Sequence, residues 1–119
     1  MSRTRILLVN GDATVQHLRA LMLRMRGHFV DTAATLDAAH AQILSRSYDL
    51  VIVDVGHFAA PGLEFCEQIK KNSPDLKVLM QVNDNVFLDR HSCPDKVVYK
   101  QEGPQTFIHE VETLLQAAP

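Results

Sequence analysis

The sequence predicts an α/β fold, in which a doubly wound parallel sheet carries helices on both faces. Several short apolar runs, among them Leu50-Val51-Ile52-Val53, are rich in β-branched residues and show no alternation, which is typical of strands buried on both faces. Longer segments between these runs space their apolar residues at helical intervals. Because strands alternate with helices along the whole chain, we expect the sheet to be parallel.

Five strands follow from the apolar runs. They span residues 5–9, 28–32, 48–53, 76–82 and 96–99. The third strand ends just before Asp54, and the carboxyl ends of such strands are where open α/β sheets place their chemistry. We therefore expect Asp54 to be either the working residue of the protein or the remnant of one.

Two helices are expected over residues 13–26 and 36–45. A third is expected around Pro61, whose ring suits the first turn of a helix, and a last one opens with Gly103 and Pro104. Residues 83–95 hold few periodic apolar residues, so at most two helical turns fit there, near residues 86–90. The apolar positions that mark the helices are Val15, Leu18, Leu21, Met22 and Met25 in the first, Leu36, Ala39, Ile43 and Leu44, directed inward, in the second, Leu63, Cys66 and Ile69 in the third, and Phe107, Val111 and Leu114 in the last.

The composition favours one globular domain with a single core. The chain has 119 residues, 46% of them hydrophobic, and a formal net charge of −2, with no sign of a basic nucleic-acid surface. Most of the arginines in the first quarter are expected on the solvated face of a helix. The two cysteines form no CxxC pattern, and no apolar stretch reaches the ~18 residues of a membrane span. With no signal peptide at the N-terminus, we expect a cytoplasmic protein that contacts neither nucleic acid nor membrane.

The segment DLVIVDVGHFAAPGLEFCEQIKKNSPDLKVLM, residues 49–80, resembles the receiver domain of bacterial two-component response regulators. The resemblance covers essentially residues 1–119 as one receiver domain, and it implies a flavodoxin-like sheet of strand order 2-1-3-4-5. Asp54 falls on the phosphoacceptor aspartate of this family, and Lys100 falls on the lysine that contacts the phosphoryl group. The resemblance also implies a protein partner, either a histidine kinase or an output protein or domain.

The sequence departs from the family pattern at several functional positions. Asn10 and Gly11 stand where the family places two adjacent metal-binding acids, and Asp12 comes one residue late. Val82 replaces the Thr or Ser that ends the fourth strand, and Val97 replaces the aromatic switch residue of the fifth. The interval between Val82 and Lys100 is short, so the helix between strands four and five is expected to be shortened.

The metal site is expected to be weak or absent. Its remaining ligands would be Asp12, Asp54 and the backbone carbonyl of Gly56, and Mg²⁺ prefers carboxylates held in rigid octahedral geometry. Asp12 has a competing role, because it stands where the first helix needs an N-cap. We expect no cofactor beyond a weakly held Mg²⁺, and no enzymatic activity.

These departures favour a divergent pseudo-receiver, which acts as a phosphorylation-independent protein-interaction module. The surface expected to bind the partner comprises residues 83–95, the fifth strand and the last helix. The alternative is a functional receiver that a histidine kinase phosphorylates on Asp54. A third class, a flavin-binding or enzymatic protein of the same fold, lacks its GxGxxG or GxxxxGK[ST] phosphate loop.

Overall fold

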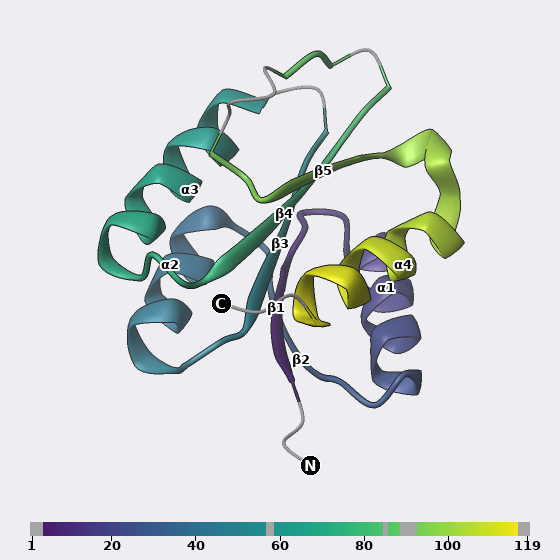
Figure 1. Ribbon diagram of the computed structural model, residues 1–119, viewed down its shortest axis with the longest axis horizontal. Coiled ribbons are helices and arrows are strands. Elements are labelled where there is room, and N and C mark those ends of the chain that lie inside the picture. Colours follow the sequence, from purple (N-terminus) through teal and green to yellow (C-terminus); the bar gives the residue numbers. More distant parts are fainter. Residues whose placement is uncertain (1–3, 57–58, 85, 89–92, 117–119) are drawn as a thin grey trace.

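The computed structural model describes residues 4–56, 59–84, 86–88 and 93–116. A five-stranded parallel sheet has the order β2-β1-β3-β4-β5 and forms the centre of the molecule (Figure 1). The order implied by the family resemblance is therefore confirmed. The strands are β1 (Arg5–Val9), β2 (Phe29–Ala33), β3 (Leu50–Gly56), β4 (Lys77–Val82) and β5 (Lys96–Tyr99).

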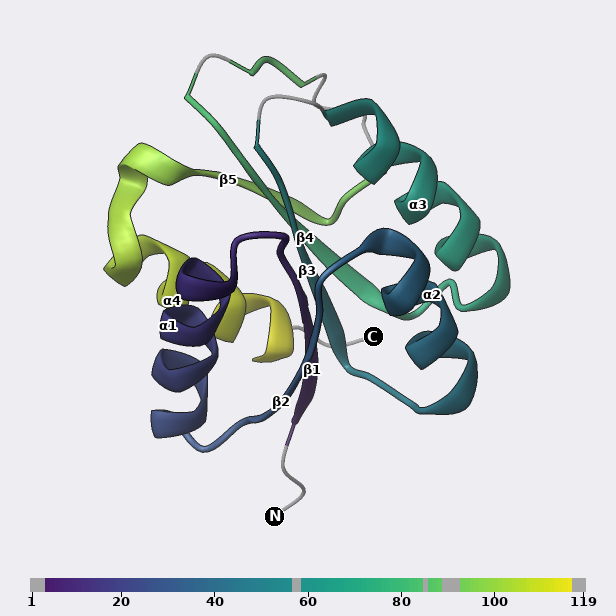
Figure 2. The ribbon, with the colours of Figure 1, turned by 180° about the vertical axis from the view of Figure 1, so that it is seen from behind.

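Helices cover both faces of the sheet, as expected. One face carries α1 (Ala13–Met25) and α4 (Gly103–Gln116), and the other carries α2 (Leu36–Ser45) and α3 (Ala59–Asn72), an arrangement visible from both sides (Figures 1 and 2). A short 3₁₀ turn, η1 (Lys100–Glu102), joins β5 to α4. None of the helices in the described part of the chain is long and apolar enough to cross a membrane.

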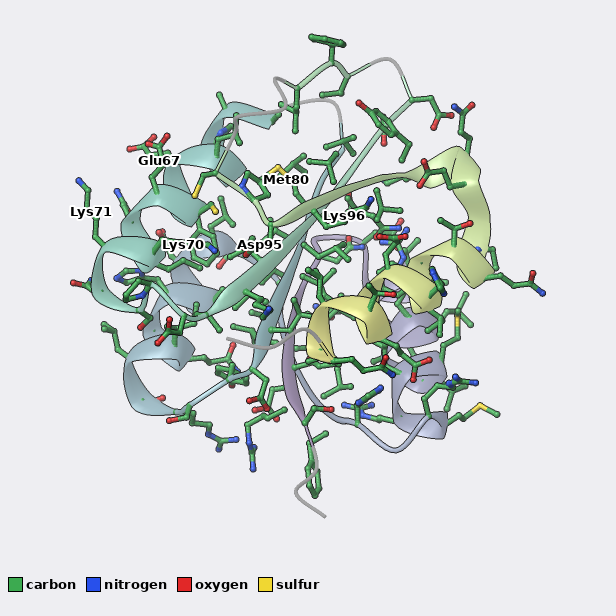
Figure 3. All side chains as sticks on the ribbon, in the orientation of Figure 1. Glu67, Lys70, Lys71, Met80, Asp95 and Lys96 are labelled. Carbon is green, nitrogen blue, oxygen red and sulfur yellow. The ribbon has the colours of Figure 1, made fainter. Side chains whose placement is uncertain are left out.

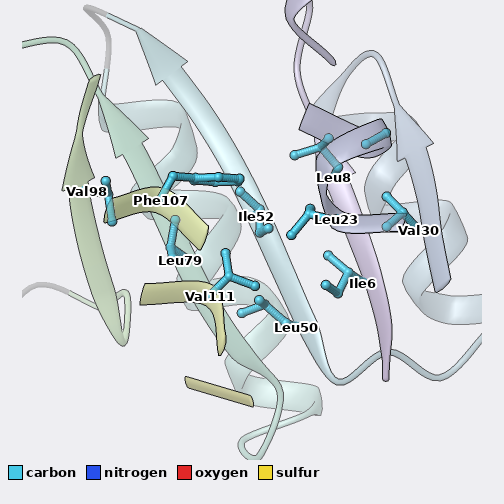
Figure 4. Close-up of a cluster of buried hydrophobic side chains, with 11 residues drawn as sticks. Ile6, Leu8, Leu23, Val30, Leu50, Ile52, Leu79, Val98, Phe107 and Val111 are labelled. Carbon is cyan, nitrogen blue, oxygen red and sulfur yellow. The ribbon is translucent and has the colours of Figure 1, made fainter. Parts of the chain in front are cut away.

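The core has two layers, one on each side of the sheet, which explains the unbroken apolar runs. In β1, Ile6 and Leu8 pack beneath α1 and α4, whereas Leu7 and Val9 pack beneath α2 and α3. Figure 4 shows the first of these clusters, where Phe107 from α4 lies among strand side chains. Because successive strand residues point to opposite faces and both faces are covered, neither side needs polar residues.

Strand β3 extends further than expected. The sequence predicts a strand over residues 48–53, but β3 runs from Leu50 to Gly56, so Asp54 lies inside the strand. The pairing of β3 with β4 shifts between Asp54 and Gly56, where Gly56 adopts a φ of +60°. This shift interrupts the regular pairing beside Asp54, and β-bulges of this kind commonly re-aim side chains beside functional sites.

Helix α1 turns its sequence-marked apolar stripe largely toward solvent. Ala20 and Leu23 are the buried residues of α1, whereas Leu18 is 54% exposed and Met25 is 79% exposed. Apolar residues lie on two sides of this helix, so periodicity alone does not identify the packed side. The side against the sheet also carries Gln16, whose side-chain amide donates to the carbonyl of Leu8.

The inward positions of the other helices are mostly correct. Ala39, Cys66, Ile69, Phe107 and Val111 are buried as expected. The prediction for Leu44 was wrong, because this side chain at the end of α2 is 71% exposed.

The segment between β4 and β5 holds no helix in residues 83–84, 86–88 and 93–95. At most two helical turns were expected near residues 86–90, of which 89 and 90 lie outside the described residues. The segment re-enters the sheet at Asp95, whose carboxylate accepts from the backbone N–H of Val78 at 2.8 Å. Lys70 of α3 pairs with the same carboxylate at 2.6 Å (Figure 3). These contacts fix the start of β5.

Candidate functional site around Asp54

Asp54 lies near the carboxyl end of β3, on the face of the sheet that α1 and α4 cover. Its side chain is 6% exposed. The strand pairing sets Asp54 beside Gln81 of β4, and both residues stand close to the edge where the parallel strands end. The predicted site residue is therefore placed where α/β sheets position their chemistry.

Both oxygens of the Asp54 carboxylate have donors. Oδ2 lies 2.8 Å from Nη1 of Arg19 and 3.2 Å from Nζ of Lys100, and it accepts from Nδ2 of Asn10 at 3.1 Å. Oδ1 accepts from the backbone N–H of Gly56 at 3.0 Å. One buried carboxylate thus faces two cations. Asp54, Arg19 and Lys100 together therefore carry a net positive charge.

Arg19 is the residue that sequence reasoning missed. The arginines of the first quarter were expected mostly on a solvated helix face, but the Arg19 side chain is 15% exposed and points to Asp54. Its guanidinium carbon also lies 5.7 Å from the ring centroid of Phe107, within the range of a cation–π contact. The available signal was its spacing, since Arg19 follows Gln16 by three residues and precedes Leu23 by four, on the buried side of α1.

Lys100 meets Asp54, as the family resemblance implies. It follows β5 directly and begins η1, and its side chain is 38% exposed, so its ammonium reaches the carboxylate from solvent. The pairing of β4 with β5 and of β3 with β4 brings the two strand ends together.

Asn10 and Asp12 form a turn between β1 and α1. Asn10 is buried, and its Oδ1 accepts from the N–H of Asp12 at 2.8 Å, while its Nδ2 points to Asp54. Asp12 caps α1, because its Oδ1 accepts from the N–H groups of Thr14 and Val15 at 3.0 and 3.1 Å. Gly11, between them, is exposed.

Gly56, Val82 and Val97 complete the positions that the sequence singled out. The carbonyl of Gly56 accepts from the N–H of Asn83 at 3.0 Å, which ties the end of β3 to the residue after β4. Val82 is fully buried next to Gly56, and Val97 is half-buried in β5 beside Met80. Neither valine has a hydroxyl or an aromatic ring to offer a phosphoryl group or a switch.

The donor set does not fit a magnesium ion. Mg²⁺ is usually held by one or two carboxylates and several waters in octahedral geometry, and the carboxylate oxygens must be free to bind it. Here Asp54 is occupied by Arg19 and Lys100, Asn10 turns an N–H₂ donor toward it, and Asp12 caps a helix. Within the described ranges, no three His, Cys, Asp or Glu side chains gather as a metal site would require. A dication would also meet the net positive charge around Asp54.

Comparison with known proteins identifies relatives among bacterial regulators. The family model for the response regulator receiver domain matches residues 6–108. The transcriptional regulatory protein ResD of Bacillus subtilis is 28% identical over 98% of this chain and 50% of its own length. The chain thus spans about half the length of this curated relative.

Solved structures agree with this assignment. The response regulator TrrA of Thermotoga maritima, crystallised with Mg²⁺ and BeF, is 27% identical, covers 93% of this chain and 98% of its own, and has a TM-score of 0.83. TrrA was also crystallised in complex with the histidine kinase ThkA. The orphan response regulator HP1043 of H. pylori shares the fold, with a TM-score of 0.84 at 21% identity over 97% of this chain and all of its own. With the observed strand order and the family match over most of its length, the chain belongs to the response regulator receiver domains.

Proposed function

We propose that this receiver domain is atypical and works as a protein-interaction module without phosphorylation of Asp54. The observation that carries the proposal is the state of the Asp54 carboxylate, which is 6% exposed and ion-paired to both Arg19 and Lys100. The neighbouring donors bind both oxygens of this carboxylate, so neither oxygen is left free to react.

The chemistry of phosphoryl transfer supports this proposal. An aspartate becomes phosphorylated when one of its oxygens attacks phosphorus, and the crowded negative charge is ordinarily offset by a bound dication. In this chain Oδ2 is held by three donors, Arg19, Lys100 and Asn10, and Oδ1 accepts from the backbone N–H of Gly56. The replacement of an acid by Asn10 and of a hydroxyl by Val82 removes further parts of the family's machinery.

The partner surface is part of the proposal. We assign it to residues 83–95, β5 and α4, and to a protein partner in the cytoplasm, such as a histidine kinase or an output protein. The complex of the relative TrrA with a histidine kinase supports a partner of this class. No direct contact with nucleic acid is proposed for this domain, whose net charge is −2.

Intact-mass spectrometry after incubation with acetyl phosphate tests the proposal. We expect no phosphoryl adduct on the wild-type chain, either in Mg²⁺ or in EDTA. A double variant, Asn10→Asp with Arg19→Ala, restores an acid at the family's metal-binding position and removes the competing cation. It should acquire a phosphoryl adduct in Mg²⁺ but not in EDTA. An adduct on the wild-type chain that depends on Mg²⁺ and on Asp54 would contradict the proposal.

A second candidate is a phosphoacceptor that needs no metal. It is favoured by the two cations at Asp54, since Arg19 and Lys100 together could neutralise a phosphoryl group. This candidate predicts an adduct on the wild-type chain in both Mg²⁺ and EDTA, lost in Asp54→Asn. The same spectra therefore separate the two candidates.

A further inference from the structure

A small cavity lies between α1, the end of β4 and the start of α4, next to the cations that bind Asp54. Its volume is about 190 Å³. A water molecule occupies about 30 Å³ in the liquid, so the cavity has room for a molecule of about six or seven non-hydrogen atoms. The two helices that flank it cover the same face of the sheet (Figures 1 and 2).

Gln81 of β4 is a buried polar residue in the wall of this cavity. It is 4% exposed, and its side-chain Oε1 has no hydrogen-bond partner within the described residues. A buried amide without partners destabilises a fold, so its presence calls for an explanation. A ligand in the cavity supplies one, because a half-turn of the amide presents either its N–H₂ group or its carbonyl.

The cavity is also lined by Arg19 and Lys100, whose two positive charges exceed the single negative charge of Asp54. Within the described ranges Arg19 donates one hydrogen bond, from Nη1 to Asp54, so its other N–H groups are available to a ligand. Gly103, the first residue of α4, lies in the same wall and brings the positive end of a helix dipole. These groups favour a ligand with one negative charge.

The rest of the wall is mostly apolar. Leu18 and Met22 contribute from α1, and Phe107 contributes from α4. A phosphate ion would have to turn some of its oxygens toward these side chains and would lose water there without gaining a hydrogen bond. A ligand with an anionic head and a short aliphatic tail matches both parts of the wall.

We propose that this cavity binds a short aliphatic monocarboxylate of about five carbons, which has the number of atoms that its volume admits. The carboxylate accepts hydrogen bonds from the Gln81 amide, Arg19 and Lys100, and the tail packs against Leu18 and Met22. This site is independent of the proposed function, because it exists whether or not Asp54 accepts a phosphoryl group.

Amide NMR of the ¹⁵N-labelled chain during titration with isovalerate tests the proposal. We expect saturable shifts at the cavity residues with a dissociation constant of about 1 mM, since so small a ligand makes few contacts. Acetate, which lacks the tail, should bind at least ~5-fold more weakly, and the uncharged 3-methylbutanol should give no saturable shift. The absence of saturable shifts with isovalerate, or equally tight binding of inorganic phosphate, would overturn the proposal.

Two pairs of variants locate the ligand. Lys100→Met should weaken isovalerate binding at least ~10-fold, whereas Lys71→Met removes the same charge from α3 on the other face of the sheet and should leave binding unchanged. Leu18→Ala should weaken it ~3-fold, because the tail loses apolar contact. Leu21→Ala is the matched control, since Leu21 is 47% exposed on the same helix and does not line the cavity. Equal effects within either pair would contradict the assigned site.

Gln81→Leu separates binding from folding. Leucine has a similar size and removes the unpaired amide, so the melting temperature should stay the same or rise while isovalerate affinity falls at least ~5-fold. Thermal unfolding and the NMR titration give the two values for the same variant. Unchanged affinity, or a lower melting temperature, would show that Gln81 serves the fold and not a ligand, and would overturn the proposal.

Discussion

The ion pair between Arg19 and Asp54 is the residue-scale feature that distinguishes this site. Its atoms approach to 2.8 Å with side chains 15% and 6% exposed, and Arg19 also stacks near Phe107. Removing one partner of a buried pair leaves an uncompensated charge, which is far more costly than losing a pair on the surface. Arg19 therefore links β3, α1 and α4 through one side chain.

A double-mutant cycle measures that link. Arg19→Met and Asp54→Asn, alone and combined, should give a coupling energy of about 2 kcal/mol in urea unfolding, because the two side chains share a buried contact. The control is Arg46→Met, which removes a pair with Asp31 whose arginine is 57% exposed, and it should change stability by less than ~0.5 kcal/mol. Additive effects of Arg19→Met and Asp54→Asn would argue against the pair.

Tyr48 provides a prediction for alkaline pH. Burial, and then its hydrogen bond to Asp31 at 2.8 Å, raise the pKa of Tyr48 to about 12. Because an unfolded tyrosine has a pKa near ~10, the unfolded chain loses this proton first as the pH rises. Stability contributed by the neutral phenol is therefore present below pH ~10 and is lost between about pH 10 and 12.

Absorbance titration and urea unfolding check this prediction. In Tyr99→Phe, Tyr48 is the one tyrosine left of two, and its tyrosinate absorbance should appear near pH 12. Between pH 9 and 11 the unfolding free energy should fall more in the wild-type chain than in Tyr48→Phe. A Tyr48 midpoint near pH 10 is the result that contradicts it.

At the scale of elements, the N-cap of α1 decides the role of Asp12. Its Oδ1 accepts from two N–H groups at the start of the helix. Asp12→Ala should therefore lower stability by about 1 kcal/mol, whereas Asp12→Asn, which also caps well, should leave it nearly unchanged. Thermal or urea unfolding of the two variants gives the comparison, and equal losses in both would mean that the charge of Asp12 matters more than its cap.

The sequence predicts the elements better than the faces they bury. The strands are recognisable because a sheet covered on both sides demands short, unbroken apolar runs, and β5 and the start of α4 agree with expectation. The stripe at Leu18 and Met25 was misleading, because α1 carries apolar residues on two sides and local periodicity does not record which side meets the sheet. Near residues 86–90, where at most two helical turns were expected, residues 86–88 form no helix.

Only part of the candidate site could be predicted from the sequence. The family resemblance placed Asp54 and Lys100 together, and the strand order agrees, since Asp54 lies near the carboxyl end of β3 and Lys100 directly follows β5 at the same edge of the sheet. Arg19 comes from the middle of a helix, and its partner depends on the rotation of α1 about its axis. Its role needed the tertiary structure.

At the scale of the whole molecule, two apolar layers stabilise the fold. At the edge of the sheet where Asp54 lies, side chains of the same chain bind its carboxylate. Asn10, Arg19 and Lys100 satisfy Asp54, and the N–H of Asn83 occupies the carbonyl of Gly56. The receiver fold is thus compatible with a site whose carboxylate is paired to cations of the same chain.

The most direct test of this account is a Mg²⁺ titration of the uniformly ¹⁵N-labelled chain, followed by amide NMR. We predict that the resonances of Asn10, Asp12, Asp54 and Gly56 stay in place up to roughly 10 mM Mg²⁺, because the ligand oxygens are occupied and the charge around Asp54 is positive. A saturable shift centred on Asp54 and Gly56 would contradict the claim that Arg19 and Lys100 stand in place of the metal.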